Sequence, residues 1–179
     1  MVAKGRPEPP MGLLRRLDAA ARAAFPGLFT ACLLILAVVP VGIPGMITAV
    51  AMPSIFFWTI FRPAAMPAPV VFSLGLLQDF LTFAALGTGV LTLLILHGVA
   101  LRARDLLLRQ SFLMVWVVFC VFAAGVSALG WGLQAMLNLQ LPPLAPGLHQ
   151  FGVAVGLYPA MAWVLARLHT SMRRAETAL

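Results

Sequence analysis

Long apolar runs alternate with short polar or proline-containing breaks along the whole chain, and six of these runs read as membrane-crossing helices. A crossing helix needs about 20 apolar residues, with a range of about 17–25. The second run is short and contains Pro53, which a membrane helix tolerates with a kink. The expected spans are residues 26–43, 46–61, 70–86, 88–101, 112–137 and 150–168. The pattern predicts an all-α, polytopic integral membrane protein with six transmembrane helices.

The composition supports lipid as the solvent of this chain. Apolar residues make up 62% of the sequence and charged residues only 9%, with a mean hydropathy of +1.02. Soluble domains carry about 25% charged residues. So few charged groups cannot cover a core of this size with a water-facing shell.

All twelve lysines and arginines fall on one side of the predicted membrane. With the N-terminus inside, they lie in the N-terminal tail, the 62–69 linker, the 102–110 loop and the C-terminal segment, as the positive-inside rule requires. The arginines taken to set this topology are Arg62, Arg102, Arg104, Arg109, Arg173 and Arg174. We therefore expect both termini in the cytoplasm. The clusters are not interleaved with aromatic residues, which argues against nucleic-acid binding despite the net charge of +7.

The expected organisation is a basic cytoplasmic tail over residues 1–25, a six-span domain over 26–170 and a short basic tail over 171–179. In the first tail, a short helix lying on the membrane surface is compatible with Leu13, Leu14 and Leu17 and with Arg15, Arg16 and Arg22. A disordered or loosely helical tail fits the same residues equally well.

A carboxylate lies inside the third expected span, where Gln78 and Asp79 follow one another among leucines and phenylalanines. An acid at the bilayer centre costs about 2.5–3.5 kcal/mol on insertion scales. Asp79 is the only acid in any expected span. Because an ion or proton relay usually needs several ionisable groups along a path, a structural hydrogen-bonding role is the favoured interpretation and a relay is the alternative.

Small and polar residues in the spans mark candidate helix contacts. Gly75, Asp79 and Thr82 share one helical face, and Gly152 and Gly156 form a GxxxG pattern that predicts close packing. The helix-packing or partner-contact candidates are Gly75, Gln78, Asp79, Thr82, Gly87, Ser127, Gln134, Gly152 and Gly156.

The sequence shows none of the local patterns of the common hydrolases and metal sites, such as G-x-S-x-G or HExxH. Cys32 and Cys120 fall in apolar runs with no CxxC neighbour or nearby histidine, so they read as small buried residues. We expect a protein that is not an enzyme and that carries no cofactor or metal.

The segments PSIFFWTIFRP and FSLGLLQDFLTFAALGTGVL, separated by a short linker, resemble the core signature of the MreD family of rod shape-determining membrane proteins. The residues that carry the resemblance are Pro53, Arg62, Pro63, Gly75, Leu76, Gln78, Asp79, Leu86 and Gly87.

The resemblance implies a scaffold of the bacterial elongation machinery in the inner membrane, regulating cell shape and lateral peptidoglycan synthesis. The implied partners are the membrane helix of MreC, RodA with its penicillin-binding transpeptidase, indirectly MreB, and membrane lipids. It also implies a fold similar to the substrate-binding subunits of energy-coupling-factor transporters. A vitamin-binding subunit of that kind is therefore the alternative function, with Gln78, Asp79, Gln134 and Asn138 as candidate lining residues.

Overall fold

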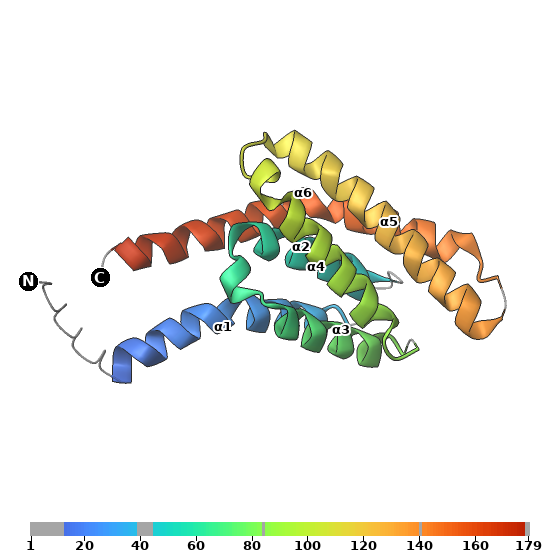
Figure 1. Ribbon diagram of the computed structural model, residues 1–179, viewed down its shortest axis with the longest axis horizontal. Helices are drawn as coiled ribbons and strands as arrows, with labels where there is room; N and C mark the ends of the chain where they lie inside the picture. Colours follow the sequence, from blue (N-terminus) through green and yellow to red (C-terminus); the bar gives the residue numbers. More distant parts are fainter. Residues whose placement is uncertain (1–12, 39–44, 84, 140, 178–179) are drawn as a thin grey trace, which may run out of the picture.

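The computed structural model describes residues 13–38, 45–83, 85–139 and 141–177, and within them the chain is helical with no strand (Figure 1). The elements, in chain order, are α1 (Leu13–Leu36), α2 (Met46–Phe61), the 3-10 turn η1 (Pro63–Ala65), α3 (Ala68–Thr82), α4 (Thr88–Leu107), α5 (Phe112–Asn138) and α6 (Leu144–Thr177). A helix occupies each of the six predicted segments, which confirms the all-α prediction.

Several helix ends differ from the predicted ones. Helix α1 runs from Leu13 to Leu36 instead of over 26–43, and residues 39–43 of that predicted span lie outside the described residues. Helix α4 ends at Leu107 instead of residue 101, and α6 runs from Leu144 to Thr177 instead of over 150–168. The predicted ends follow the limits of the apolar runs. Arginine, leucine and alanine are good helix formers, however, and a helix need not end where its sequence becomes charged.

Helix α3 is shorter than predicted, because it ends at Thr82 instead of residue 86. Phe83 has a φ of 51°, in the left-handed region that ends a helix, and Gly87 follows with a φ of 99°. The left-handed conformation is unfavourable for a residue with a side chain. From the sequence, a glycine would be expected to end this helix. The structure has a phenylalanine in that role, which the sequence does not indicate.

Two helical segments are long and apolar enough to cross a membrane, Phe112–Leu137 and Leu144–Ser171. In an apolar 18-residue stretch of each segment, only 22% is buried inside the molecule, whereas the core helix of a soluble protein is mostly buried. Shorter apolar helices are Ala20–Leu36, Met46–Phe61 and Ala68–Thr82. The two long segments are consistent with a membrane protein, while the six crossings and the likeness to transporter subunits stay predictions.

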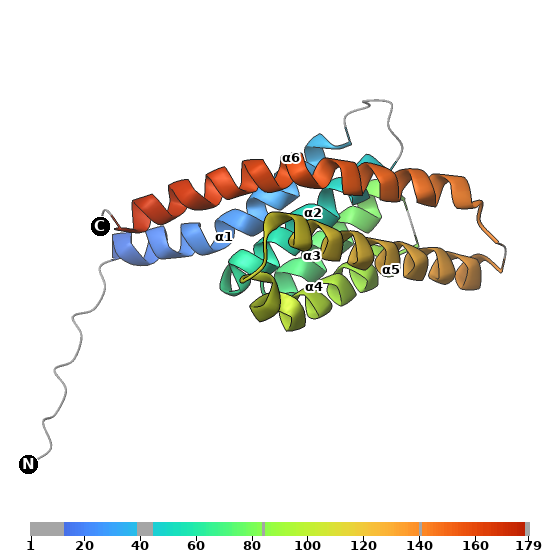
Figure 2. The same ribbon diagram turned by 90° about the horizontal axis from the view of Figure 1, so that it is seen from above.

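Helix α2 is the central helix of the bundle, and every residue from Ala49 to Ile60 is buried. It packs against α1, α4 and α6, while α3 packs against α4 (Figures 1 and 2). Phe56 of α2 contacts Phe119 of α5 and Tyr158 of α6, with ring centroids 5.2 and 6.0 Å apart. Beyond this cluster, α5 and α6 continue as a hairpin past the rest of the bundle.

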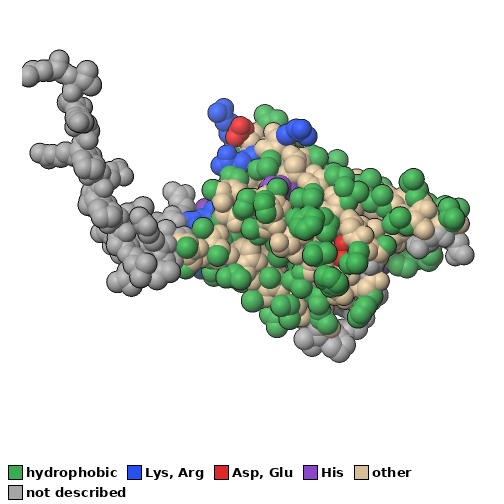
Figure 3. Space-filling view, turned by 60° about the horizontal axis from the view of Figure 1, so that its bottom comes forward, with side chains coloured by type: hydrophobic (Ala, Val, Ile, Leu, Met, Phe, Trp, Pro, Cys, Tyr) green, Lys and Arg blue, Asp and Glu red, His purple; other side chains and the backbone are tan. Residues whose placement is uncertain are grey.

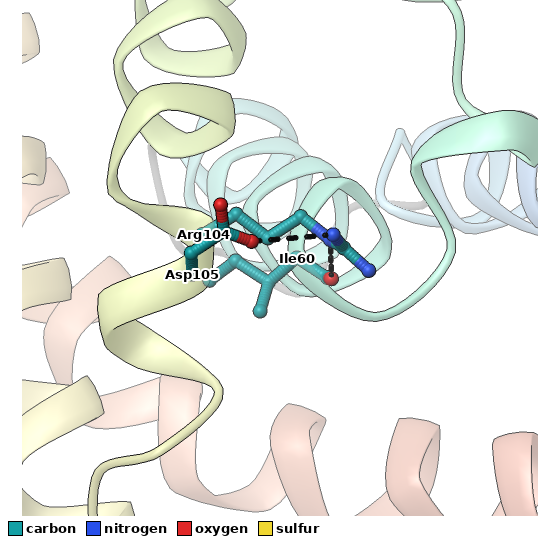
Figure 4. A network of polar contacts seen from close by, with 3 residues as sticks. All are labelled: Ile60, Arg104 and Asp105. Carbon is teal, nitrogen blue, oxygen red and sulfur yellow. Dashed lines mark hydrogen bonds and ion pairs between the residues drawn. The ribbon is translucent and has the colours of Figure 1, made fainter.

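Two polar contacts join α4 to α2. Thr59 Oγ1 and His97 Nδ1 lie 2.8 Å apart in the buried interface. At the end of α2, Arg104 Nε donates to the Ile60 carbonyl at 2.8 Å, and the Arg104 guanidinium lies 3.6 Å from Asp105 (Figure 4). A cation suits this position, because the last carbonyls of a helix lack partners within the helix and carry partial negative charge.

Candidate functional site

The Asp79 carboxylate binds the N-terminus of the neighbouring helix. Its Oδ2 accepts a hydrogen bond from the Gly87 amide at 2.8 Å, and its Oδ1 accepts one from the Gly89 amide at 2.7 Å. Only 1% of Asp79 is exposed. The first amides of a helix have no partners within the helix and attract negative charge. Asp79 of α3 therefore caps the N-terminus of α4. The N-cap residue of α4, Gly87, has no side chain that could do so.

Glycine at position 89 makes this contact sterically feasible. A Cβ on Gly89 would collide with the Asp79 carboxylate. Gly87 adopts a left-handed conformation that glycine tolerates at little cost. The two glycines thus let the carboxylate approach the amides of the first helical turn.

Gly75 lies one turn before Asp79 on α3 and allows the two helix backbones to approach closely. A Cβ on Gly75 would lie 2.6 Å from the Cα of Val90 in α4. The predicted helix-packing role of Gly75 therefore corresponds to an observed close contact. The contact also fixes the position of α3 along α4. Asp79 is thereby aligned with the amides of Gly87 and Gly89, from which it accepts hydrogen bonds.

Gln78 and Asp79 also line a cavity of about 890 Å³, whose walls come from the ends of several helices. Gln78 is 95% buried, yet its Oε1 has no hydrogen-bond partner among the described residues. Ser127 of α5, which also lines the cavity, likewise has a buried Oγ without such a partner. Two residues with a buried, unpaired polar atom therefore line the same cavity.

The remaining polar candidates of this region are brought to the same place. Thr82 and Gln134 both line the cavity, and the Thr82 hydroxyl donates to the backbone carbonyl of Gln78 at 2.9 Å. The sequence interpretation missed Gln150 of α6, which lies beside Gly45 and lines the cavity. Gln150 is the first residue of the sixth predicted span, and no local sequence pattern connects it with Gln78 in the third span. The side chain of Asn138 lies outside the described residues.

Gly152 and Gly156 are not brought to this site. Both lie on an exposed face of α6, and a Cβ added to either would meet nothing within 4 Å among the described residues. The GxxxG pattern therefore makes no close contact inside the described chain. It leaves a strip of small residues on the outer face of α6.

The cavity and the arginines lie at opposite ends of the helices. The cavity is lined by the start of α2 and α4 and the end of α3, whereas Arg62 follows α2 and Arg102, Arg104 and Arg109 lie around the end of α4. Figure 3 shows basic side chains gathered at one end of a largely hydrophobic surface. The side chains of Arg173 and Arg174 lie outside the described residues.

Comparisons of this chain with protein-family models, with curated proteins and with solved structures gave no match. The resemblance to the MreD family therefore rests on the motif residues of the sequence alone.

Proposed function

We propose that the protein is a non-enzymatic scaffold of the MreD type in the bacterial inner membrane, crossing it six times with both termini in the cytoplasm. In this role it holds the membrane helix of MreC and, through that complex, acts with RodA, its penicillin-binding transpeptidase and MreB in lateral peptidoglycan synthesis. Its contribution is to bind and position partners, with no chemical step of its own.

The observation that carries the proposal is that the motif carboxylate, Asp79, binds the N-terminus of the neighbouring helix. Both oxygens of Asp79 accept hydrogen bonds from amides of α4, and the motif glycine Gly75 seats the two helices against each other. The motif residues that suggest the family thus lock α3 to α4. A rigid helix pair of this kind suits a protein whose task is to present a fixed surface.

The outer face of α6 is the surface that best suits a single partner helix. Small residues let two membrane helices approach closely, and Gly152 and Gly156 leave such a strip uncovered within the described chain. The neighbouring α5 adds exposed apolar side chains, including Val117 and Val121. We therefore place the MreC helix against α6 in this proposal.

The test is capture of MreC from membranes in mild detergent, with the bound proteins identified by mass spectrometry. The wild-type chain is expected to retain MreC, and replacement of Gly152 and Gly156 by leucine is expected to release it. Gly98→Leu on α4 is the matched control, because its Cβ position also faces open space. Absence of MreC from the wild-type capture would overturn the proposal, and loss only in the control would move the contact to α4.

A second candidate function is supported by the cavity. A substrate-binding subunit of an energy-coupling-factor-type vitamin transporter needs a pocket with a few placed polar groups, and Gln78, Asp79 and Gln134 line one at the end away from the arginines. Capture of an ATPase module together with a vitamin in the purified protein would favour this function. Capture of MreC without such a module would favour the scaffold.

A further inference from the structure

The cavity beside Asp79 has the size and lining of a ligand site. Its volume of about 890 Å³ lies within the range of about 300–1,000 Å³ that is typical of small-molecule pockets. Apolar residues such as Met46, Met52 and Val126 make up much of the wall, and a few amides and hydroxyls lie among them. Trp131 adds an aromatic wall whose indole N–H is already held by the Pro142 carbonyl at 3.0 Å.

The unpaired atoms indicate which chemical groups a ligand would bring. Gln78 Oε1 is an acceptor that needs a donor, and a buried unpaired polar atom costs about 1–3 kcal/mol. The Ser127 hydroxyl can donate and can also accept. A ligand hydroxyl satisfies both needs, because it carries a donor and an acceptor on one atom.

The charges around the cavity argue for a neutral ligand. Asp79 is the only charged side chain among the described lining residues, and the sequence has no lysine or arginine between Arg62 and Arg102 or between Arg109 and Arg167. An anion would therefore meet a carboxylate and no cation. A cation would find that carboxylate already engaged by the amides of Gly87 and Gly89.

We propose that this cavity binds the hydroxyl-rich, uncharged part of a small molecule or lipid, with Gln78 accepting from one hydroxyl and Ser127 exchanging a hydrogen bond with another. The site stands on the cavity itself and on neither proposed function. Capture of MreC and binding of this ligand are separate measurements, so either can fail without the other.

A lipid-borne headgroup is one source of this chemistry, and a free sugar or polyol is the other. An apolar groove of about 200 Å³ between α4 and α5, lined by residues such as Ile95, Val99 and Gly125, shares Val126 with the cavity. Its apolar lining suits an acyl chain. The experiment therefore presents the same headgroup in both forms.

The test uses the full chain in phosphatidylcholine nanodiscs with two radiolabelled probes, monoglucosyl diacylglycerol and methyl α-glucoside. Saturable binding of the first probe alone assigns the site to a lipid, and saturable binding of both shows that the headgroup suffices. Inorganic phosphate and choline serve as an anionic and a cationic competitor, and neither is expected to displace the glucosyl probe.

The variant Gln78→Met keeps the length of the side chain but removes its amide, and it is expected to weaken binding about tenfold, the effect of one lost hydrogen bond. Gln110→Met is the matched control, an exposed glutamine at the arginine end of the molecule, and should bind as wild type does. Ser127→Ala provides a second, smaller change if Gln78→Met fails to fold, and should also weaken binding.

The proposal is overturned if neither glucosyl probe binds saturably, as a cavity filled only with water would give. It is also overturned if phosphate or choline displaces the probe. Equal affinity for wild type and a folded Gln78→Met or Ser127→Ala variant would place the binding elsewhere.

Discussion

Replacing Asp79 by leucine tests whether the carboxylate holds α4 in place. Leucine cannot accept the hydrogen bonds that the amides of Gly87 and Gly89 donate at 2.8 and 2.7 Å. Both amides would then lose their acceptor at the buried junction of α3 and α4. The change should therefore lower the free energy of unfolding without altering any residue of α4 itself.

The expected size follows from the two lost bonds. A buried donor without a partner costs about 1–3 kcal/mol, so two give about 2–6 kcal/mol. The result should fall in the lower half of that range, because leucine is easier to bury than a carboxylate. Asp79→Asn keeps one acceptor oxygen for one of the two amides, and its loss should be about half as large.

The assay is reversible unfolding of the purified protein in mixed micelles, followed by tryptophan fluorescence and circular dichroism as the fraction of denaturing detergent rises. Asp105→Asn is the matched control, since the side chain of Asp105 is 91% exposed. The control should unfold as wild type does. Asp79→Leu with wild-type stability, or Asp79→Asn as severe as Asp79→Leu, would refute the capping role.

Three further changes can be measured in the same unfolding assay. Gly75→Ala places a Cβ against the α4 backbone and should lower the free energy of unfolding by about 1–3 kcal/mol. The control Gly98→Ala faces open space and should be neutral or stabilising by up to about 1 kcal/mol. Equal effects of the two variants would contradict close packing at Gly75. Thr59→Val removes the 2.8 Å partner of buried His97 and should cost about 1–3 kcal/mol, and an unchanged transition would show that this hydrogen bond does not contribute. Arg104→Gln weakens a contact whose side chain is 34% exposed, so the loss should stay below about 1 kcal/mol and shrink in salt; a larger, salt-independent loss would contradict this.

The apolar runs were enough to predict six helices and their approximate places, since each run reports its own local pattern. They did not predict where α1 begins or where α4 and α6 end, because charged residues of good helix propensity extend these helices. Helix α3 ends at Thr82 because Phe83 adopts a left-handed conformation, which no local residue pattern predicts.

The sequence also predicted a structural role for Asp79 and close packing at Gly75. The acceptor geometry could not be predicted, because it depends on how α3 turns back against the first amides of α4. The cavity could not be predicted for the same reason, because residues far apart in the sequence, such as Gln78 and Gln150, line it together. For Gly152 and Gly156, the GxxxG pattern indicated a packing face without indicating that this face points away from the described chain.

The most direct test of the account is the side of the membrane on which the cavity end lies. In a chain with Cys32 and Cys120 replaced by alanine, a single cysteine is introduced as Pro143→Cys, between α5 and α6, or as Gln110→Cys, between α4 and α5. Intact cells are then treated with a membrane-impermeant maleimide. The account predicts that position 143 is labelled directly and that position 110 is labelled only after the cells are permeabilised. Labelling of position 110 in intact cells, with position 143 protected, would contradict it.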